Sequence, residues 1–249
     1  MDVGAAKRIA VLCTEPPARR VVEIGPGTGA LTAALVGCNA DVTAIEIDAD
    51  MVAILHERAD LEAATIVLAD ALSYDYAEHG RAGPWCAAGN LPYNIATPLL
   101  AKWLELAVPP ARIVAMVQRE VADRLTAAPA TPAYGSLTVF CRYFATVRRA
   151  FVLKPNVFYP RPNVDSAVVV LEPHPVPALS VRDRVFFLQV VRGAFAYRRK
   201  TLANSLLLAL DIDRARTQSA LAALDIDSEI RAEQLDLGAF GALADDLAP

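Results

Sequence analysis

The sequence predicts an α/β protein with a Rossmann-like, mostly parallel sheet that has an antiparallel edge strand, followed by a small all-helical domain. Short β-rich apolar runs alternate with helical stretches in the first half, and a glycine-rich turn follows the first run. A proline-rich break then precedes four helical segments. The chain has 249 residues, 55% of them hydrophobic and 21% charged, which excludes wholesale disorder and allows a sizeable core.

The N-terminal residues 1–13 predict an ordinary helix, because charged residues interrupt an apolar pattern too short for a secretory signal. The predicted strands that follow are 20–24, 41–46, 65–68, 85–88 and 113–118. The predicted helices between and after them are 30–36, about 50–59, 98–106 and about 120–127. This alternation predicts βαβ units and a parallel sheet covered on both faces. We expect the last strands at 136–143 and 166–171.

Residues 172–177 contain three prolines, which suits a linker better than a helix or strand. Beyond them, the apolar spacing predicts helices at 182–196, 199–210, 213–224 and 237–247. We therefore expect two domains, residues 1–173 and residues 178–249.

The net charge of −4 conceals an uneven distribution. Residues 142–200 contain 11 Lys and Arg against 3 Asp and Glu, a net charge of +8, whereas residues 1–80 carry −8. A basic segment in an acidic chain is typical of polyanion binding, and the alternative is a solvated face whose charges balance in space. No stretch approaches the roughly 20 apolar residues of a membrane span. The four cysteines form no CxxC pair, which favours reduced thiols in a cytosolic protein.

Three predicted strands end in groups that suit a ligand. Gly25 and Gly27 lie in the turn after the first strand, where glycine lets the backbone approach a ligand closely. Glu46 ends the second strand, where an acidic residue accepts hydrogen bonds from ribose hydroxyls. Asp70 closes the third strand and could accept a hydrogen bond from an adenine amino group. The alternatives are helix capping by Glu46 with Asp48, and by Asp70. A dinucleotide and an adenosyl ligand both fit this pattern.

The stretch Asn90-Leu91-Pro92-Tyr93 follows the fourth predicted strand. The Asn90 side-chain oxygen and the Leu91 carbonyl can each accept a hydrogen from an exocyclic aromatic amine, which aims its lone pair at a sulfonium methyl. Tyr93 can stack on the base. No strong general base is then needed. The structural alternative is a proline-stiffened turn with a packed tyrosine.

Several motifs together resemble the KsgA family of rRNA adenine dimethyltransferases, over essentially the whole chain. The segments that carry the resemblance are GPGTG at 25–29, EID at 46–48, NLPYNIATP at 90–98, QREV at 118–121, YGSL at 134–137, FYPRPNVDSA at 158–167 and FAYRRKTL at 195–202.

This resemblance implies a class I methyltransferase sheet, S-adenosyl-L-methionine as methyl donor, no metal, and two adjacent adenines near the 3′ end of small-subunit (16S) rRNA as target. By position, it implies cofactor contacts at Gly25, Gly27, Glu46, Asp70 and Asn90. It implies a catalytic loop formed by Asn90, Leu91, Pro92 and Tyr93, and a base stacked between Tyr93 and Phe158. The alternative for Phe158 is a packed loop aromatic.

The basic segment gains a role from the same resemblance. We expect RNA phosphate contacts from Arg148, Arg149, Arg161, Arg198, Arg199 and Lys200. The last three could equally form a solvated helix terminus. The expected partner is small-subunit rRNA in an immature 30S subunit, with a monomeric, cytoplasmic protein and no membrane contact.

Members of the family have a Gln-Asn-Phe-Leu lid segment just before the position of Asp2, where this sequence starts. Without a lid we expect weaker cofactor affinity and impaired closure. One alternative function is large-subunit rRNA adenine methylation of the macrolide-resistance type. A second is a ribosome-assembly factor with impaired catalysis. A small-molecule methyltransferase would leave the +8 segment unexplained, and a dehydrogenase lacks a hydride-transfer partner in this loop.

Overall fold

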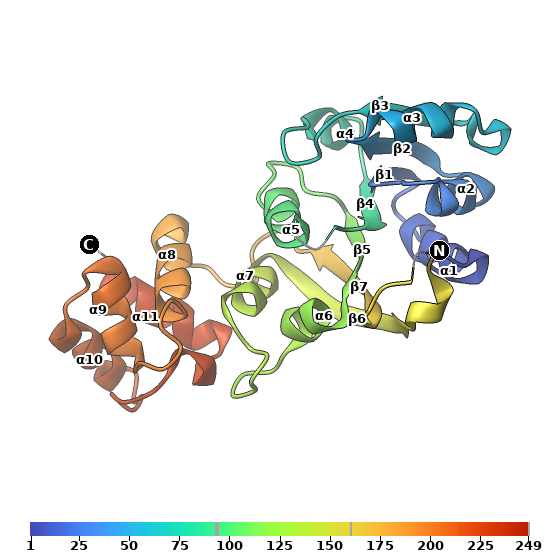
Figure 1. The fold of residues 1–249 in the computed structure, drawn as a ribbon. Helices are drawn as coiled ribbons and strands as arrows, with labels where there is room; N and C mark the ends of the chain where they lie inside the picture. Colours follow the sequence, from blue (N-terminus) through green and yellow to red (C-terminus); the bar gives the residue numbers. More distant parts are fainter. Residues whose placement is uncertain (93–94, 160, 249) are drawn as a thin grey trace. The chain divides into compact units, whose positions relative to one another are not determined.

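The computed structural model describes residues 1–92, 95–159 and 161–248 (Figure 1). The chain forms two compact units. The N-terminal unit comprises Met1–Ala122 and Thr146–Pro173, and the C-terminal unit comprises Asp123–Ala145 and His174–Pro249. Residues 123–145, expected in the first domain from sequence, thus group with the C-terminal helices.

Within the described residues, seven strands form one sheet, ordered β3-β2-β1-β4-β5-β7-β6. In chain order the strands are β1 (Arg20–Ile24), β2 (Asp41–Glu46), β3 (Ala64–Leu68), β4 (Trp85–Asn90), β5 (Arg112–Gln118), β6 (Ala145–Leu153) and β7 (Ser166–Pro173). The first five strands pair in parallel, and β7 pairs antiparallel with β5. The predicted mostly parallel sheet with an antiparallel edge is confirmed.

The helices along the N-terminal half connect these strands as βαβ units require. They are α1 (Val3–Thr14), α2 (Ala30–Gly37), α3 (Ala49–His56), the 3₁₀ turn η1 (Ala59–Leu61), α4 (Ala77–Arg81), α5 (Ala96–Leu104), α6 (Arg119–Thr126) and the 3₁₀ turn η2 (Pro155–Val157).

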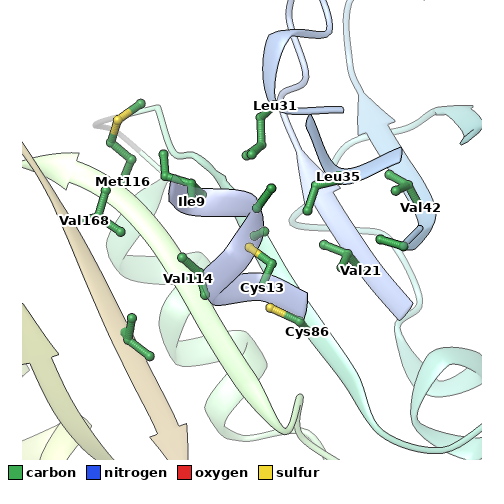
Figure 2. Packing of buried hydrophobic residues seen from close by; sticks show 14 of the residues in the cluster. Ile9, Cys13, Val21, Leu31, Leu35, Val42, Cys86, Val114, Met116 and Val168 are labelled. Carbon is green, nitrogen blue, oxygen red and sulfur yellow. The ribbon is translucent and has the colours of Figure 1, made fainter. Parts of the chain in front are cut away.

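Apolar side chains cover both faces of the sheet, which explains why its central strands are nearly continuous hydrophobic runs. On one face, α1 and α2 pack against β1, β2, β4, β5 and β7 (Figure 2). This core cluster includes Ile9, Cys13, Leu35, Val114 and Val168, all at most 1% exposed. On the other face, the rings of Tyr76, Trp85 and Trp103 pack together, with centroids about 6 Å apart.

One sequence prediction was wrong, and one strand was missed. The expected strand at 136–143 is instead the helix α7 (Ser136–Phe144). Its Thr and Val residues favour a strand locally, but tertiary burial overrides that preference. Leu137, Phe140, Cys141 and Phe144 are buried at helical spacing. The strand β6, which follows directly, was missed because its consecutive charges at Arg148 and Arg149 hide a period of two.

The C-terminal unit is helical within the described residues. Besides α7, it contains α8 (Arg184–Ala194), α9 (Leu202–Leu210), α10 (Arg214–Ala223), the 3₁₀ turn η3 (Ala232–Gln234) and α11 (Leu237–Leu247). The ring of Tyr143 lies 4.8 Å from that of Phe187, and the Tyr134 hydroxyl donates to the Leu235 carbonyl at 2.8 Å. These contacts explain why 123–145 group with this unit.

None of the helices in the described ranges combines the length and hydropathy needed to span a membrane. All four cysteines are free. Cys13, Cys86 and Cys141 are buried and Cys38 is half-buried.

Candidate cofactor and catalytic site

A cavity of about 280 Å³ lies at the carboxyl ends of the parallel strands. The segments that follow β1, β2, β3 and β4 all contribute to its wall, as expected for an open α/β sheet. Its lining residues are Ile24, Gly25, Ile45, Glu46, Ile47, Ala69, Asp70, Ala71, Pro92 and Ile95. Three of the predicted cofactor residues, Gly25, Glu46 and Asp70, therefore share one cavity.

Glu46 is held at the end of β2 by backbone donors. Its Oε1 accepts hydrogen bonds from the N–H groups of Ile47 and Asp48, at 2.9 and 3.1 Å, and its Oε2 accepts from Gly27 at 3.3 Å. The carboxylate of Asp48, in contrast, caps α3. The two acidic residues thus have separate roles, and only Asp48 acts as a helix cap.

Gly25 leaves room for a ligand against the backbone. Its φ of +64° is in the left-handed region, and its N–H donates to the Ile45 carbonyl at 3.0 Å. A Cβ added at Gly25 would meet no atom within 4 Å. A Cβ at Gly29, in contrast, would come within 2.7 Å of Leu61. The turn after β1 is therefore open on its cavity side and packed where it joins α2.

Asp70 lies exposed at the rim of the cavity. Its Oδ1 accepts a hydrogen bond from the Leu72 N–H at 2.8 Å, and its carbonyl accepts from the Tyr74 N–H at 2.9 Å. The helix that follows, α4, begins only at Ala77. Asp70 thus shapes a turn and does not cap a helix.

The last residue of β4, Asn90, and the residue after it, Leu91, present two acceptors. Asn90 is exposed, whereas Leu91 is buried and its N–H donates to the Met116 carbonyl at 3.0 Å. The Pro92 carbonyl is occupied at the start of α5 by the N–H groups of Ile95 and Ala96. Among the described residues, no group bonds to the Asn90 side chain or donates to the Leu91 carbonyl. Both acceptors are therefore available to a substrate amino group. The predicted catalytic residue Tyr93 lies outside the described residues.

Two features near the cavity were missed from sequence. Ile47, directly after Glu46, is 69% exposed and gives the cavity an apolar surface suited to a flat ring. Glu23 is 1% exposed on β1, and its Oε2 has no hydrogen-bond partner in the described part of the chain. Burial, reinforced by the charge of Glu46, raises the pKa of Glu23 to about 7. An acidic residue inside a strand is the signal that could have identified Glu23.

Comparison with known proteins identifies the family. Residues 4–245 match the family described as ribosomal RNA adenine dimethylase. The chain belongs to the ribosomal RNA adenine dimethylase family. The protein named ribosomal RNA small subunit methyltransferase A from Streptococcus gordonii is 40% identical over 236 residues, which span 91% of this chain and 81% of that protein. A protein of the same name from Streptococcus pneumoniae is 41% identical over the same shares.

Two solved structures share the fold of this chain. A dimethyladenosine transferase from Plasmodium falciparum has a TM-score of 0.79 and 24% identity, over 96% of this chain and 94% of that chain. The 23S rRNA methyltransferase ErmE has a TM-score of 0.73 and 24% identity, over 100% and 99%. These likenesses confirm the Rossmann-like methyltransferase fold with a helical C-terminal region.

The described residues 158–159 and 161–165 of the predicted motif lie between η2 and β7. Phe158 is half-buried and packs against the core cluster, and its stacking on a base stays a prediction. The Asp165 carboxylate pairs with Lys154 at 2.8 Å and with Arg119 at 3.4 Å. This ion-pair group ties the end of the loop to its beginning and to the start of α6. It also lowers the pKa of Asp165, chiefly through the Lys154 hydrogen bond.

The predicted RNA-binding residues of this chain occur in both of its units. Arg148 and Arg149 are exposed on β6, and Arg161 is exposed in the loop that follows η2. Arg198, Arg199 and Lys200 are exposed between α8 and α9, and Arg198 donates to the Pro132 carbonyl at 2.8 Å. Their contacts with RNA stay a prediction. Among the described residues, no group of three or more His, Cys, Asp and Glu side chains could hold a metal ion.

Proposed function

We propose that this protein transfers methyl groups from S-adenosyl-L-methionine to N6 of two adjacent adenines near the 3′ end of small-subunit rRNA, forming N6,N6-dimethyladenine. The observation that carries the proposal is that the cavity lined by Gly25, Glu46 and Asp70 reaches Pro92, which directly follows the two acceptors, the Asn90 side-chain oxygen and the Leu91 carbonyl, to which no described residue donates. The name of the relatives at 40–41% identity, ribosomal RNA small subunit methyltransferase A, supports the choice of substrate.

The residues present fit the cofactor. The open space at Gly25 allows a ligand to contact the backbone, and Glu46 is positioned to accept hydrogen bonds from ribose hydroxyls. Asp70 accepts from the adenine amino group, while Ile47 covers a face of the ring. S-adenosyl-L-methionine supplies an electrophilic methyl group on a sulfonium. We propose no metal for this chemistry.

Asn90 and Leu91 activate the substrate by hydrogen bonding. The amino nitrogen of adenine is a poor nucleophile because its lone pair is delocalised into the ring. In the first transfer, the Asn90 side-chain oxygen and the Leu91 carbonyl would each accept one of its hydrogens, so that the nitrogen moves toward tetrahedral geometry and its lone pair becomes available. In the second transfer the nitrogen has one hydrogen left, and one of the two acceptors would hold it. Each transfer replaces one N–H by N–CH₃ and releases its proton to solvent. Tyr93 and Phe158 would stack on the extruded base, which requires Phe158 to leave its packed position.

We further propose that the exposed basic residues of both units bind rRNA phosphates. These contacts position the RNA without identifying its sequence. The substrate would be an immature 30S subunit, bound by a monomer in the cytoplasm. Residues 1–173 would supply the cofactor and catalytic groups, and residues 178–249 would contact the ribosome.

Two alternatives are weaker. Methylation of large-subunit rRNA is supported only by a shared fold with ErmE at 24% sequence identity. The relatives at 40–41% identity are named as small-subunit methyltransferases. A pure assembly factor would have no use for the free acceptors of Asn90 and Leu91.

The decisive test measures methyl transfer from labelled S-adenosyl-L-methionine to unmethylated small ribosomal subunits, with large subunits as the comparison substrate. We expect label in dimethyladenine of small-subunit rRNA. The rate should fall on the order of 100-fold or more in Asn90→Ala. The matched control Asn204→Ala, a half-buried asparagine of α9, should retain the wild-type rate. Label confined to large subunits, or subunit binding without transfer by the wild type, would refute the proposal.

A further inference from the structure

Lys102 connects helix α5 to the segment that carries Asp70. Its Nζ donates to the Leu72 carbonyl at 2.6 Å and to the Tyr74 carbonyl at 2.8 Å. The same ammonium lies 5.2 Å from the centroid of the Tyr76 ring. One side chain thus holds two carbonyl groups of the segment 70–76, which we call the rim loop.

Lys102 bonds to the same two residues, Leu72 and Tyr74, that donate hydrogen bonds to Asp70. The Leu72 N–H donates to the Asp70 Oδ1 at 2.8 Å, and the Tyr74 N–H donates to the Asp70 carbonyl at 2.9 Å. Leu72 and Tyr74 are therefore bound on both sides, by Asp70 through their N–H groups and by Lys102 through their carbonyls. The ammonium therefore bonds directly to Leu72, the residue whose N–H orients the Asp70 carboxylate.

The exposed part of the rim loop depends on this support. Asp70 and Leu72 are exposed, and an exposed loop with few buried apolar contacts opens at low free-energy cost. Tyr76 is buried and its hydroxyl donates to the Ala71 carbonyl at 2.8 Å, which fixes the inner side of the loop. Lys102 holds the Leu72 and Tyr74 carbonyls, with charge-assisted hydrogen bonds that are stronger than neutral ones.

We propose that Lys102 is a positioning residue for the cofactor, which sets the selectivity of the cavity for adenine by fixing the Asp70 carboxylate. This inference rests on the proposed function, because it assigns Asp70 to the adenine amino group. A fixed carboxylate accepts from the amino group of adenine and repels the oxygen that replaces it in hypoxanthine. A loosely held carboxylate discriminates less between the two bases.

The test compares binding of S-adenosylhomocysteine and S-inosylhomocysteine by titration calorimetry. We expect the wild type to prefer the adenine compound by at least roughly tenfold, and Asp70→Ala to lose this preference. Lys102→Met keeps the length of the side chain and removes its donors. It should weaken binding of the adenine compound by about tenfold and leave the hypoxanthine compound nearly unchanged.

Two further variants make the result specific. Lys102→Arg, which keeps the charge and can reach carbonyl groups, should restore part of the preference. Lys7→Met removes an exposed lysine on α1 and should change neither affinity. The inference would be overturned if Lys102→Met kept the wild-type preference. It would also be overturned if this variant lost affinity for both compounds equally and had a lower melting temperature. A wild type that binds neither compound would instead refute the proposed cofactor, and with it this inference.

Discussion

Replacing Glu46 by Gln removes one acceptor from a carboxylate that receives three backbone N–H groups. The amide oxygen can still accept from Ile47 and Asp48, but the amide NH₂ would then face the Gly27 N–H, now 3.3 Å from Oε2. Glu46 is 8% exposed, so leaving the amide NH₂ and the Gly27 N–H facing each other without an acceptor costs about 1–3 kcal/mol of stability. Loss of a charged acceptor for ribose hydroxyls costs about 1.5–3 kcal/mol of binding, or roughly 10- to 150-fold in affinity.

Calorimetric titration with S-adenosyl-L-methionine measures the binding effect, and urea denaturation measures the stability effect. The matched control is Asp48→Asn, because Asn caps a helix about as well as Asp and Asp48 is exposed. The control should keep both its affinity and its stability. If Glu46→Gln bound the cofactor as tightly as the wild type, Glu46 would not be the ribose acceptor.

Three other predictions follow from the same geometry. Gly25→Ala should lower the free energy of unfolding, measured by thermal denaturation, by about 1–2 kcal/mol, because its φ is positive. It should weaken cofactor binding by a larger free energy than this. Gly29→Ala should lose more stability than Gly25→Ala, because its methyl group meets Leu61. Burial raises the pKa of Glu23 from 4.5 to about 7, so the folded state retains a proton that the unfolded state has lost. The free energy of unfolding should therefore fall by about 3 kcal/mol as pH rises from 4.5 to 7. Urea denaturation across this range should give a flatter profile for Glu23→Gln, and parallel profiles would contradict the assignment. Asp165→Asn should slow methylation of rRNA, because its ion pairs with Lys154 and Arg119 order the loop that carries Phe158. The calorimetric cofactor affinity should stay unchanged, because this loop does not line the cavity, and an unchanged rate would exclude this role.

The parallel strands could be predicted because each is a short, mostly apolar run followed by a turn, and β1, β2, β3 and β5 are rich in β-branched residues. The region 136–153 could not, because local preference and tertiary environment conflict there. In α7, β-branched residues occupy a helix whose burial comes from the C-terminal unit. In β6, exposed arginines occupy the edge of the sheet.

The grouping of the proposed cofactor residues could be predicted for a topological reason. Gly25, Glu46 and Asp70 each lie at or just after the carboxyl end of a parallel strand, so the sheet brings them to one edge whatever their separation in the chain. The division of roles between Glu46 and Asp48 depends on which N–H groups each carboxylate receives, and spacing does not determine that. Lys102 gave no signal, because a lysine on an amphipathic helix is usually a solvated residue.

The strand order has a consequence for how such a protein can change over time. The residues proposed to bind the methyl donor lie mostly at the ends of β1, β2 and β3, on one side of the point where the strand order reverses. The residues proposed to bind the adenine that accepts the methyl group lie at the end of β4 and after β6, on the other side. Substitutions after α5 can therefore alter the RNA target with little effect on the donor site, whereas Pro92, Ile95 and Lys102 belong to that site. A chimera that keeps residues 1–104 and takes its remaining residues from a relative with another RNA target would inherit the donor site of one parent and the target of the other.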